Sequence, residues 1–207
     1  MNPEISVVLP VHNAERYVAA AVRSILRQSF GNFEVLAIDD GSTDRSAALL
    51  ERLAKSDARL RVLRREKRGI EATLNEGLAL ARGRYIARMD ADDVAQPERF
   101  ALQKIFLDGH PDYVCVGGMV LLIDAAGRPS RVVEHPRTHE AIDARHLQGF
   151  TAIMHPTAMM RTEQARAVGG YAREIRYAQD RDLWLRLAEL GKLANIPEVV
   201  LRYRQHS

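Results

Sequence analysis

The stretch Tyr85-Ile86-Ala87-Arg88-Met89-Asp90-Ala91-Asp92-Asp93 runs from an apolar segment directly into three carboxylates. The apolar segment predicts a short strand, and the carboxylates should lie at its C-terminal end. Ligands of open α/β sheets collect at the carboxyl ends of strands, and carboxylate oxygens are the hard ligands that Mg²⁺ and Mn²⁺ prefer. The stretch therefore predicts a divalent-metal site formed by Asp90, Asp92 and Asp93. The alternative is a solvated acidic loop in which Asp93 caps the next helix.

On either side of this stretch, strand patterns alternate with helix patterns. Such alternation implies right-handed crossovers and a largely parallel sheet, which is an α/β fold. Asn13 is the predicted N-cap of the first helix, and Pro97 should lie near the first turn of the fourth. The predicted strands are 5–9, 33–38, 60–63 and 85–89, and the predicted helices are 14–28, 45–56, 70–81 and a fourth that reaches residue 107.

After Asp112 the pattern becomes mixed. Residues 113–123 predict a longer strand, and residues 124–127 have the composition of a hairpin turn into 131–134. No polar linker separates the two halves, so we predict one continuous fold. The remaining predicted segments are a helix or irregular crossover at 138–147, an extended stretch at 155–161 and an amphipathic helix at 178–190.

Composition favours a globular domain and argues against several classes of protein. The chain has 207 residues, of which 46% are hydrophobic and 28% charged, so it can bury a sizeable core. Its net charge of +3 comes without a long basic tract, so nucleic acid is not a predicted partner. Cys115 is the single cysteine, which excludes an internal disulfide and indicates a reducing, cytoplasmic compartment. No apolar run approaches the roughly 20 residues of a transmembrane helix.

The chain ends in Arg202-Tyr203-Arg204-Gln205-His206-Ser207, without the Gly or Pro that commonly closes a domain. This ending is compatible with a catalytic piece, truncated at its C-terminus, of a longer protein. Peripheral contact with the inner face of a membrane also stays open, because the basic cluster 61–68 can face phosphates, an anionic bilayer or solvent.

Three loops should share one edge of the sheet because each follows a strand: residues 10–13, 39–44 and 90–93. Asp40 at a strand end can accept a hydrogen bond from a base or a ribose, whereas Asp44 is better explained as a helix cap. Neither Gly-x-Gly-x-x-Gly nor Gly-x-x-x-x-Gly-Lys follows the first strand, which argues against a dinucleotide cofactor and a P-loop.

Ser6-Val7-Val8-Leu9-Pro10-Val11-His12-Asn13 and Val35-Leu36-Ala37-Ile38-Asp39-Asp40-Gly41-Ser42-Thr43-Asp44 resemble two blocks of glycosyltransferase family 2. The resemblance runs nearly end to end. It implies a GT-A (Rossmann-like) three-layer sandwich with a mostly parallel central mixed sheet and a smaller acceptor-side region. It also implies a single domain over 1–207, in which 1–111 bind the nucleotide sugar and 112–207 supply the acceptor side and the catalytic base.

The resemblance assigns roles around the cleft. Asp40 would contact the base, while Asp92 and Asp93 would meet the ribose and the metal. Arg68 is a candidate contact to the diphosphate or the base, although a solvated surface position explains it more simply. The implied nucleotide-binding residues are Pro10, His12, Asn13, Asp40, Arg68 and Asp92, and the implied ligands of Mn²⁺ or Mg²⁺ are Asp90, Asp92, Asp93 and His206.

Ala178-Gln179-Asp180-Arg181-Asp182-Leu183-Trp184-Leu185 resembles the block that carries the family's catalytic base. At helical spacing Asp180 shares the apolar face of Leu183 and Trp184, so its carboxylate can reach a cleft. Its alternative role is a favourable interaction with the helix dipole. Gln179 stands where the family commonly has Glu, so help from a second carboxylate is not expected.

The implied function is inverting transfer of a sugar from a nucleoside-diphosphate sugar to a glycan or lipid-linked acceptor, in surface glycan or polysaccharide biosynthesis. Two alternatives stay open. A nucleotide-sugar pyrophosphorylase would need a Gly-rich loop after the first strand, which residues 10–13 do not provide. A catalytically silent nucleotide-binding module would bind the same nucleotide without transferring a sugar.

Overall fold

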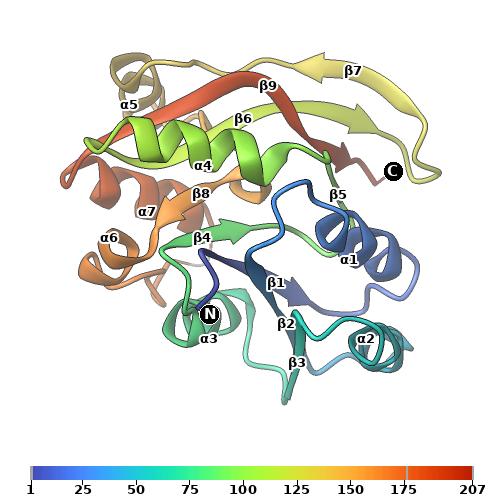
Figure 1. Ribbon diagram of the computed structural model, residues 1–207. Helices are drawn as coiled ribbons and strands as arrows, with labels where there is room; N and C mark the ends of the chain where they lie inside the picture. Colours follow the sequence, from blue (N-terminus) through green and yellow to red (C-terminus); the bar gives the residue numbers. More distant parts are fainter. Residues whose placement is uncertain (1, 176, 207) are drawn as a thin grey trace.

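The computed structural model describes residues 2–175 and 177–206. Its first half contains four strands and three helices in alternation (Figure 1). Isoleucine, valine and leucine dominate the first two strands and are buried on both sides, as is typical of a sheet that is covered on both faces. These elements are β1 (Ile5–Val11), α1 (Val18–Leu26), β2 (Phe33–Asp40), α2 (Ser46–Ala54), β3 (Leu60–Arg65), α3 (Ile70–Leu80) and β4 (Tyr85–Arg88).

The described residues of the second half form short and long strands and four helices. Its helices are α4 (Arg99–Gly109), α5 (His139–Leu147), α6 (Thr162–Ala167) and α7 (Gln179–Ala188), and a 3-10 turn spans His155–Thr157. Its strands are β5 (Val94–Ala95), β6 (Tyr113–Ile123), β7 (Pro129–Val133), β8 (Met159–Arg161) and β9 (Lys192–Arg204). The predicted hairpin between β6 and β7 is confirmed. Among the described helices, none is both long and apolar enough to cross a bilayer.

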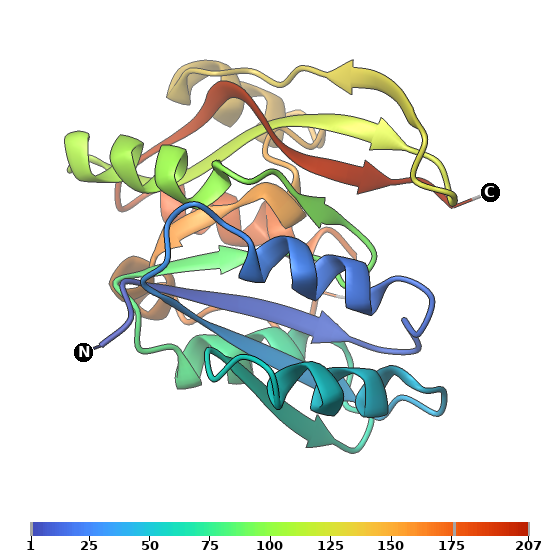
Figure 2. The same cartoon turned by 45° about the vertical axis from the view of Figure 1, so that its right-hand side comes forward.

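All of these strands join one sheet, in the order β3-β2-β1-β4-β8-β6-β9-β5, with β7 paired to β6. The strands β3, β2, β1 and β4 are parallel, as predicted. Strand β8 runs antiparallel to both β4 and β6 and so joins the two halves of the chain. Helices α1, α2 and α4 pack on one face and α3, α5, α6 and α7 on the other (Figure 2). The predicted three-layer α/β sandwich is therefore confirmed.

The first helix differs from the prediction. It begins at Val18 with Tyr17 as N-cap, so the prediction that Asn13 caps a helix from residue 14 was wrong. Asn13 instead adopts the left-handed conformation with a φ of 49°. Its N–H donates to Ser42 Oγ and its side-chain oxygen accepts from the Thr43 N–H, each over 2.9 Å. Asn13 therefore ties the loop after β1 to the loop after β2.

Strand β9 was not predicted, although it is 13 residues long and pairs with β6 along most of its length. Pro197 interrupts its apolar pattern, and a proline argues against a central strand. The register between Gly118↔Ile196 and Met119↔Val199 shifts, so Pro197 lies in a bulge and its missing N–H costs no ladder hydrogen bond. Pro97 lies directly before Glu98, the N-cap of α4, and so near the first turn of that helix, as predicted.

Glu34 at the start of β2 provides a test of this fold away from the cleft. Its buried carboxylate accepts hydrogen bonds from Ser6 Oγ (2.8 Å), Arg82 Nη2 (2.7 Å) and Arg61 Nη1 (3.1 Å). Burial alone would raise the pKa of Glu34, but the hydrogen bonds from Arg82, Ser6 and Arg61 outweigh it and lower the pKa.

We expect Glu34→Gln to lower the free energy of unfolding at pH 7 by about 1–3 kcal/mol, because charge-assisted hydrogen bonds are lost. Since the folded-state pKa is depressed, this stabilisation is present above the pKa of the unfolded state and is lost as the pH falls through the folded-state value. The deficit should therefore shrink between pH 5 and pH 3 in urea unfolding experiments. Exposed Glu66→Gln is the control, and a deficit independent of pH would contradict this account.

Candidate active site

A cleft lies at the carboxyl ends of β1, β2 and β4, where the three predicted loops meet. One part has a volume of ≈ 410 Å³, and a neighbouring part of ≈ 240 Å³ extends toward α3. Pro10, His12 and Asp90 line both parts, so the two form one continuous cleft. The larger part is also lined by Asn13, Ala14, Tyr17, Ala91, Asp92 and His206, and the smaller by Val11, Asp40, Lys67, Gly69, Ile70 and Thr73.

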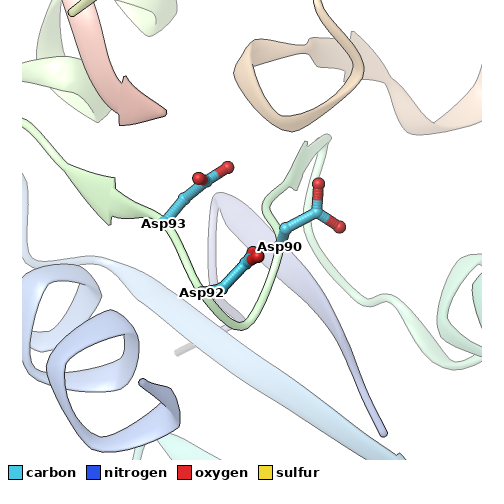
Figure 3. A group of neighbouring side chains, drawn as sticks. All are labelled: Asp90, Asp92 and Asp93. Atoms are coloured by element: carbon cyan, nitrogen blue, oxygen red, sulfur yellow. The ribbon is translucent and has the colours of Figure 1, made fainter. Parts of the chain in front are cut away.

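The three aspartates after β4 form a compact group (Figure 3). One carboxylate oxygen from each of Asp90, Asp92 and Asp93 lies within 4.8 Å of the others. Asp93 is buried, its Oδ1 accepts the Arg204 N–H over 2.8 Å, and its Oδ2 has no hydrogen-bond partner in the part of the chain that the structure describes. Burial and the neighbouring Asp90 raise the pKa of Asp93 to about 8. Hard oxygen donors with an unsatisfied buried oxygen fit a divalent cation.

The end of β9 brings His206 to this group. His206 Nε2 lies 2.6 Å from Asp92 Oδ2, so the two predicted ligands are neighbours. Arg204 fixes the same loop: its Nε donates to the Asp92 carbonyl over 2.7 Å, and its guanidinium lies over the Tyr17 ring at 4.4 Å. The C-terminal strand is therefore part of the site, which the sequence did not show because β9 was not predicted.

Asp40 holds the loop between β3 and α3, which also borders the cleft. Its Oδ1 accepts the N–H of Arg68 over 2.7 Å and its Oδ2 that of Gly69 over 3.0 Å. Gly69 has a φ of 96°, a backbone conformation that residues other than glycine rarely adopt. Asp40 therefore stabilises the turn into α3, in addition to lining the smaller part of the cleft.

The cationic side chain in the cleft is that of Lys67, not of Arg68. The Arg68 guanidinium pairs with Glu76 and does not line the cleft. Lys67 Nζ lies 3.1 Å from His12 Nε2, and His12 Nδ1 lies 2.9 Å from the Asp40 carbonyl. A proton on Nδ1 donating to that carbonyl leaves Nε2 as the acceptor for the ammonium group. Lys67 was not predicted from the sequence. A loop has no regular periodicity, so its sequence does not indicate which of several basic side chains points into the cleft.

The apolar face predicted for the last helix is confirmed. Leu183, Trp184 and Leu187 of α7 are buried, while Asp182 pairs with Arg186. Asp180 is half-buried in the first turn and does not line either part of the cleft described above.

Tyr171 connects Asp180 electrostatically with the aspartate group. Burial is the main cause that raises the pKa of Tyr171, and the negative charges of Asp180 and Asp90 both add to the increase. The phenol therefore lies within electrostatic range of both carboxylates. The Tyr171 hydroxyl lies 2.8 Å from His155 Nε2, and the buried His155 ring packs against Trp184, so His155 has a structural position. Asp180 and Asp90 are thus both close enough to the buried Tyr171 to raise its pKa.

A family model described as Glycosyl transferase family 2 matches residues 6–168, which is most of the chain. The chain belongs to this family. The match includes β1, β2, β4 and the three loops that form the cleft, and it argues against the pyrophosphorylase alternative. It ends before α7, which carries Asp180, and before His206, which follows β9.

Two curated glycosyltransferases are similar to nearly the whole chain. The putative glycosyltransferase EpsE of Bacillus subtilis (strain 168) is 36% identical over 99% of this chain and 74% of its own length. The O-antigen biosynthesis glycosyltransferase WbnJ of Escherichia coli is 30% identical over 98% of this chain and 80% of its own length.

A solved structure shares the GT-A fold. The mannosyltransferase PcManGT from Pyrobaculum calidifontis, in complex with GDP-Man and Mn²⁺, superposes with a TM-score of 0.76 over 98% of this chain and 57% of that one. The two sequences are 20% identical, so the likeness supports the fold alone.

Proposed function

We propose that this chain transfers a sugar from a nucleoside-diphosphate sugar to an acceptor hydroxyl by a single displacement that inverts the anomeric centre. The observation that carries the proposal is the cleft at the ends of β1, β2 and β4, which Asp90 and Asp92 of the aspartate group line. Such a cleft can hold a nucleotide next to a cation, and a carboxylate beyond it can serve an acceptor.

The aspartate group fits Mn²⁺ or Mg²⁺. Asp90, Asp92 and Asp93 would hold the ion, with His206 beside Asp92 as a further ligand. A bound cation supplies positive charge that binds the diphosphate and stabilises it as a leaving group. Support for the metal comes from the unsatisfied Asp93 Oδ2 and from the donor set itself.

The two parts of the cleft suggest how a nucleotide binds. The diphosphate should lie in the larger part beside Asp92, because the cation candidates line it. The base should then occupy the smaller part, next to Asp40 and Lys67. Pro10, His12 and Asn13 would line the nucleotide between them, and Arg68 would contribute through its N–H bonded to Asp40.

A comparison of Lys67 with Arg68 tests this placement. We expect Lys67→Ala to weaken nucleoside-diphosphate binding by about 5- to 30-fold, because a charge-assisted contact is lost. Arg68→Ala should change the dissociation constant by less than about twofold, because an exposed ion pair contributes little. Isothermal titration calorimetry measures both values. The reverse order of effects would contradict the placement of the nucleotide.

Asp180 is the proposed general base. Its carboxylate takes the proton of the acceptor hydroxyl while that oxygen forms a bond to the anomeric carbon. The bond from the anomeric carbon to the phosphate oxygen breaks at the same time, and its electron pair leaves with the nucleoside diphosphate. One base is sufficient for inversion, so Gln179 in place of a second carboxylate is compatible with catalysis.

We propose surface glycan or polysaccharide assembly as the biological setting, with a glycan or lipid-linked acceptor. The support is the O-antigen assignment carried by WbnJ's name. Residues 1–207 would act as one glycosyltransferase domain, since β8 joins both halves in one sheet. The buried, unpaired Cys115 fits a cytoplasmic location, and peripheral association with the inner membrane face is part of this proposal.

A donor panel tests the proposed function against a silent nucleotide-binding module. The protein is incubated with UDP-, GDP- and dTDP-sugars and Mn²⁺, with and without a mixture of glycan acceptors, and nucleoside-diphosphate release and product linkage are measured. We expect release with at least one donor, faster with acceptor, and inverted stereochemistry. Tight nucleotide binding without transfer or donor hydrolysis across the panel would contradict catalysis and favour the silent module.

A further inference from the structure

Arg88 is a buried cation directly beneath the proposed metal site. It is the last residue of β4, it is 4% exposed, and its Nη1 donates a hydrogen bond to Asp90 Oδ2. The side chain of Asp90 is itself one-third exposed and lines both parts of the cleft. The hydrogen bond from Arg88 to this oxygen of Asp90 fixes the plane of the carboxylate group.

Apart from the aspartates, the surroundings of Arg88 are mostly apolar. The guanidinium borders a small internal cavity whose other lining residues are Val8, Leu74, Leu78, Ile86, Met160, Tyr171 and Leu183. Arg88 Nε is buried without a hydrogen-bond partner in residues 2–175 and 177–206. Burial of an incompletely paired charge is unfavourable, and an apolar side chain of similar volume is often at least as stable at such a position. Stability alone therefore does not account for Arg88.

We propose that Arg88 is a positioning residue of the metal site: it orients Asp90 and offsets one of the three negative charges of the aspartate group. This inference rests on the proposed function. When all three carboxylates of Asp90, Asp92 and Asp93 are ionised, as cation binding requires, they and the guanidinium carry two negative charges in total instead of three. The aspartate group then binds a free cation less tightly. Arg88 keeps the carboxylate of Asp90 in a fixed orientation for a cation that binds together with a diphosphate.

Removal of the charge should therefore change two measurements in opposite directions. In Arg88→Met the dissociation constant for free Mn²⁺ should decrease by about 3- to 10-fold, because a nearby positive charge is gone. The kcat should decrease by about tenfold or more, because Asp90 is no longer oriented. In Arg88→Lys the Mn²⁺ affinity should stay within about twofold of wild type, because the ammonium group keeps the positive charge. The kcat should still decrease, because lysine lacks the planar guanidinium group that orients Asp90.

Arg166 supplies a matched control. Its guanidinium is bound to backbone carbonyls at the end of α3, those of Leu78, Ala79 and Ala81. Arg166→Met should lower the melting temperature and leave Mn²⁺ affinity and kcat within about twofold of wild type, because Arg166 lines neither part of the cleft.

The experiment combines Mn²⁺ calorimetry without nucleotide, steady-state kinetics and thermal unfolding on the full chain. Mn²⁺ affinity and kcat that decrease together in Arg88→Met, as general destabilisation would produce, would overturn the proposal. If Arg88→Met does not fold, Arg88→Lys decides: wild-type kinetics in that variant would overturn it equally. Absence of Mn²⁺ binding to the wild type is a different outcome, because it rejects the metal assignment itself before any variant is compared.

Discussion

Replacement of Asp180 by asparagine is expected to reduce kcat by about 10²- to 10⁴-fold, the usual contribution of a general base. Asparagine keeps the size of the side chain but cannot take the acceptor proton. Because Asp180 does not line the cleft, the affinity for the nucleoside diphosphate should stay within about twofold of wild type. The check is a transfer assay together with calorimetric nucleotide binding.

Asp182 provides the matched control for this experiment. It lies two residues further along α7 and pairs with Arg186. Asp182→Asn should change kcat by less than about threefold, because the loss of an exposed or half-exposed ion pair has a small effect. Equal losses of activity in the two variants would indicate a shared structural cause and would contradict the assignment of Asp180 as the base.

Replacement of Asp92 by asparagine should also have a large effect, a decrease in kcat/KM of about 10³-fold or more, or about 4 kcal/mol of transition-state stabilisation. Its carboxylate lines the cleft beside His206, so an amide there removes one charged ligand from the cation. The loop should keep its conformation, because Arg204 binds the backbone carbonyl of residue 92 and not its side chain.

The kinetics of Asp92→Asn should be measured over a range of Mn²⁺ concentrations. We expect activity to recover only partly, and only at much higher Mn²⁺ than the wild type needs. Asp112→Asn is the control: Asp112 is exposed, pairs with Lys192 and does not line the cleft, so it should behave as wild type. An Asp92→Asn enzyme with unchanged Mn²⁺ dependence would show that this carboxylate is not a ligand.

The architecture of the first half was predictable because each element has its own local signal. In β1 apolar residues predominate and the whole strand is buried, and in α1 the apolar residues recur at helical spacing. The convergence of three loops followed from parallel strands, and it correctly placed Asp90 and Asp92 beside His12. These predictions needed only the periodicity of single segments and a general rule about sheet edges.

The second half was harder because long-range contacts determine it. Strand β9 includes Pro197, which only the register shift against β6 accommodates. Strand β5 has two residues, too few for any period. His206 lies beside Asp92 because of the path of β9, so their proximity could be predicted only from the family resemblance.

Side-chain direction in loops was the least predictable feature of the site. Lys67 and Arg68 are adjacent and both basic, but only Lys67 lines the cleft, because Glu76 of α3 binds Arg68. Asn13 has the residue type of a helix cap and instead bridges two loops. In each case a partner distant in sequence decides the conformation.

The most direct test of the central claim, that the aspartates after β4 hold a cation for a diphosphate, is calorimetric titration of UDP, GDP and dTDP into the wild type and Asp93→Asn, with Mn²⁺ and with EDTA. The asparagine can still accept the Arg204 N–H, so the variant should fold. We predict that at least one nucleotide binds the wild type at least about tenfold more tightly with Mn²⁺, and that the variant loses this gain. Equal affinity with Mn²⁺ and with EDTA in the wild type would contradict the account.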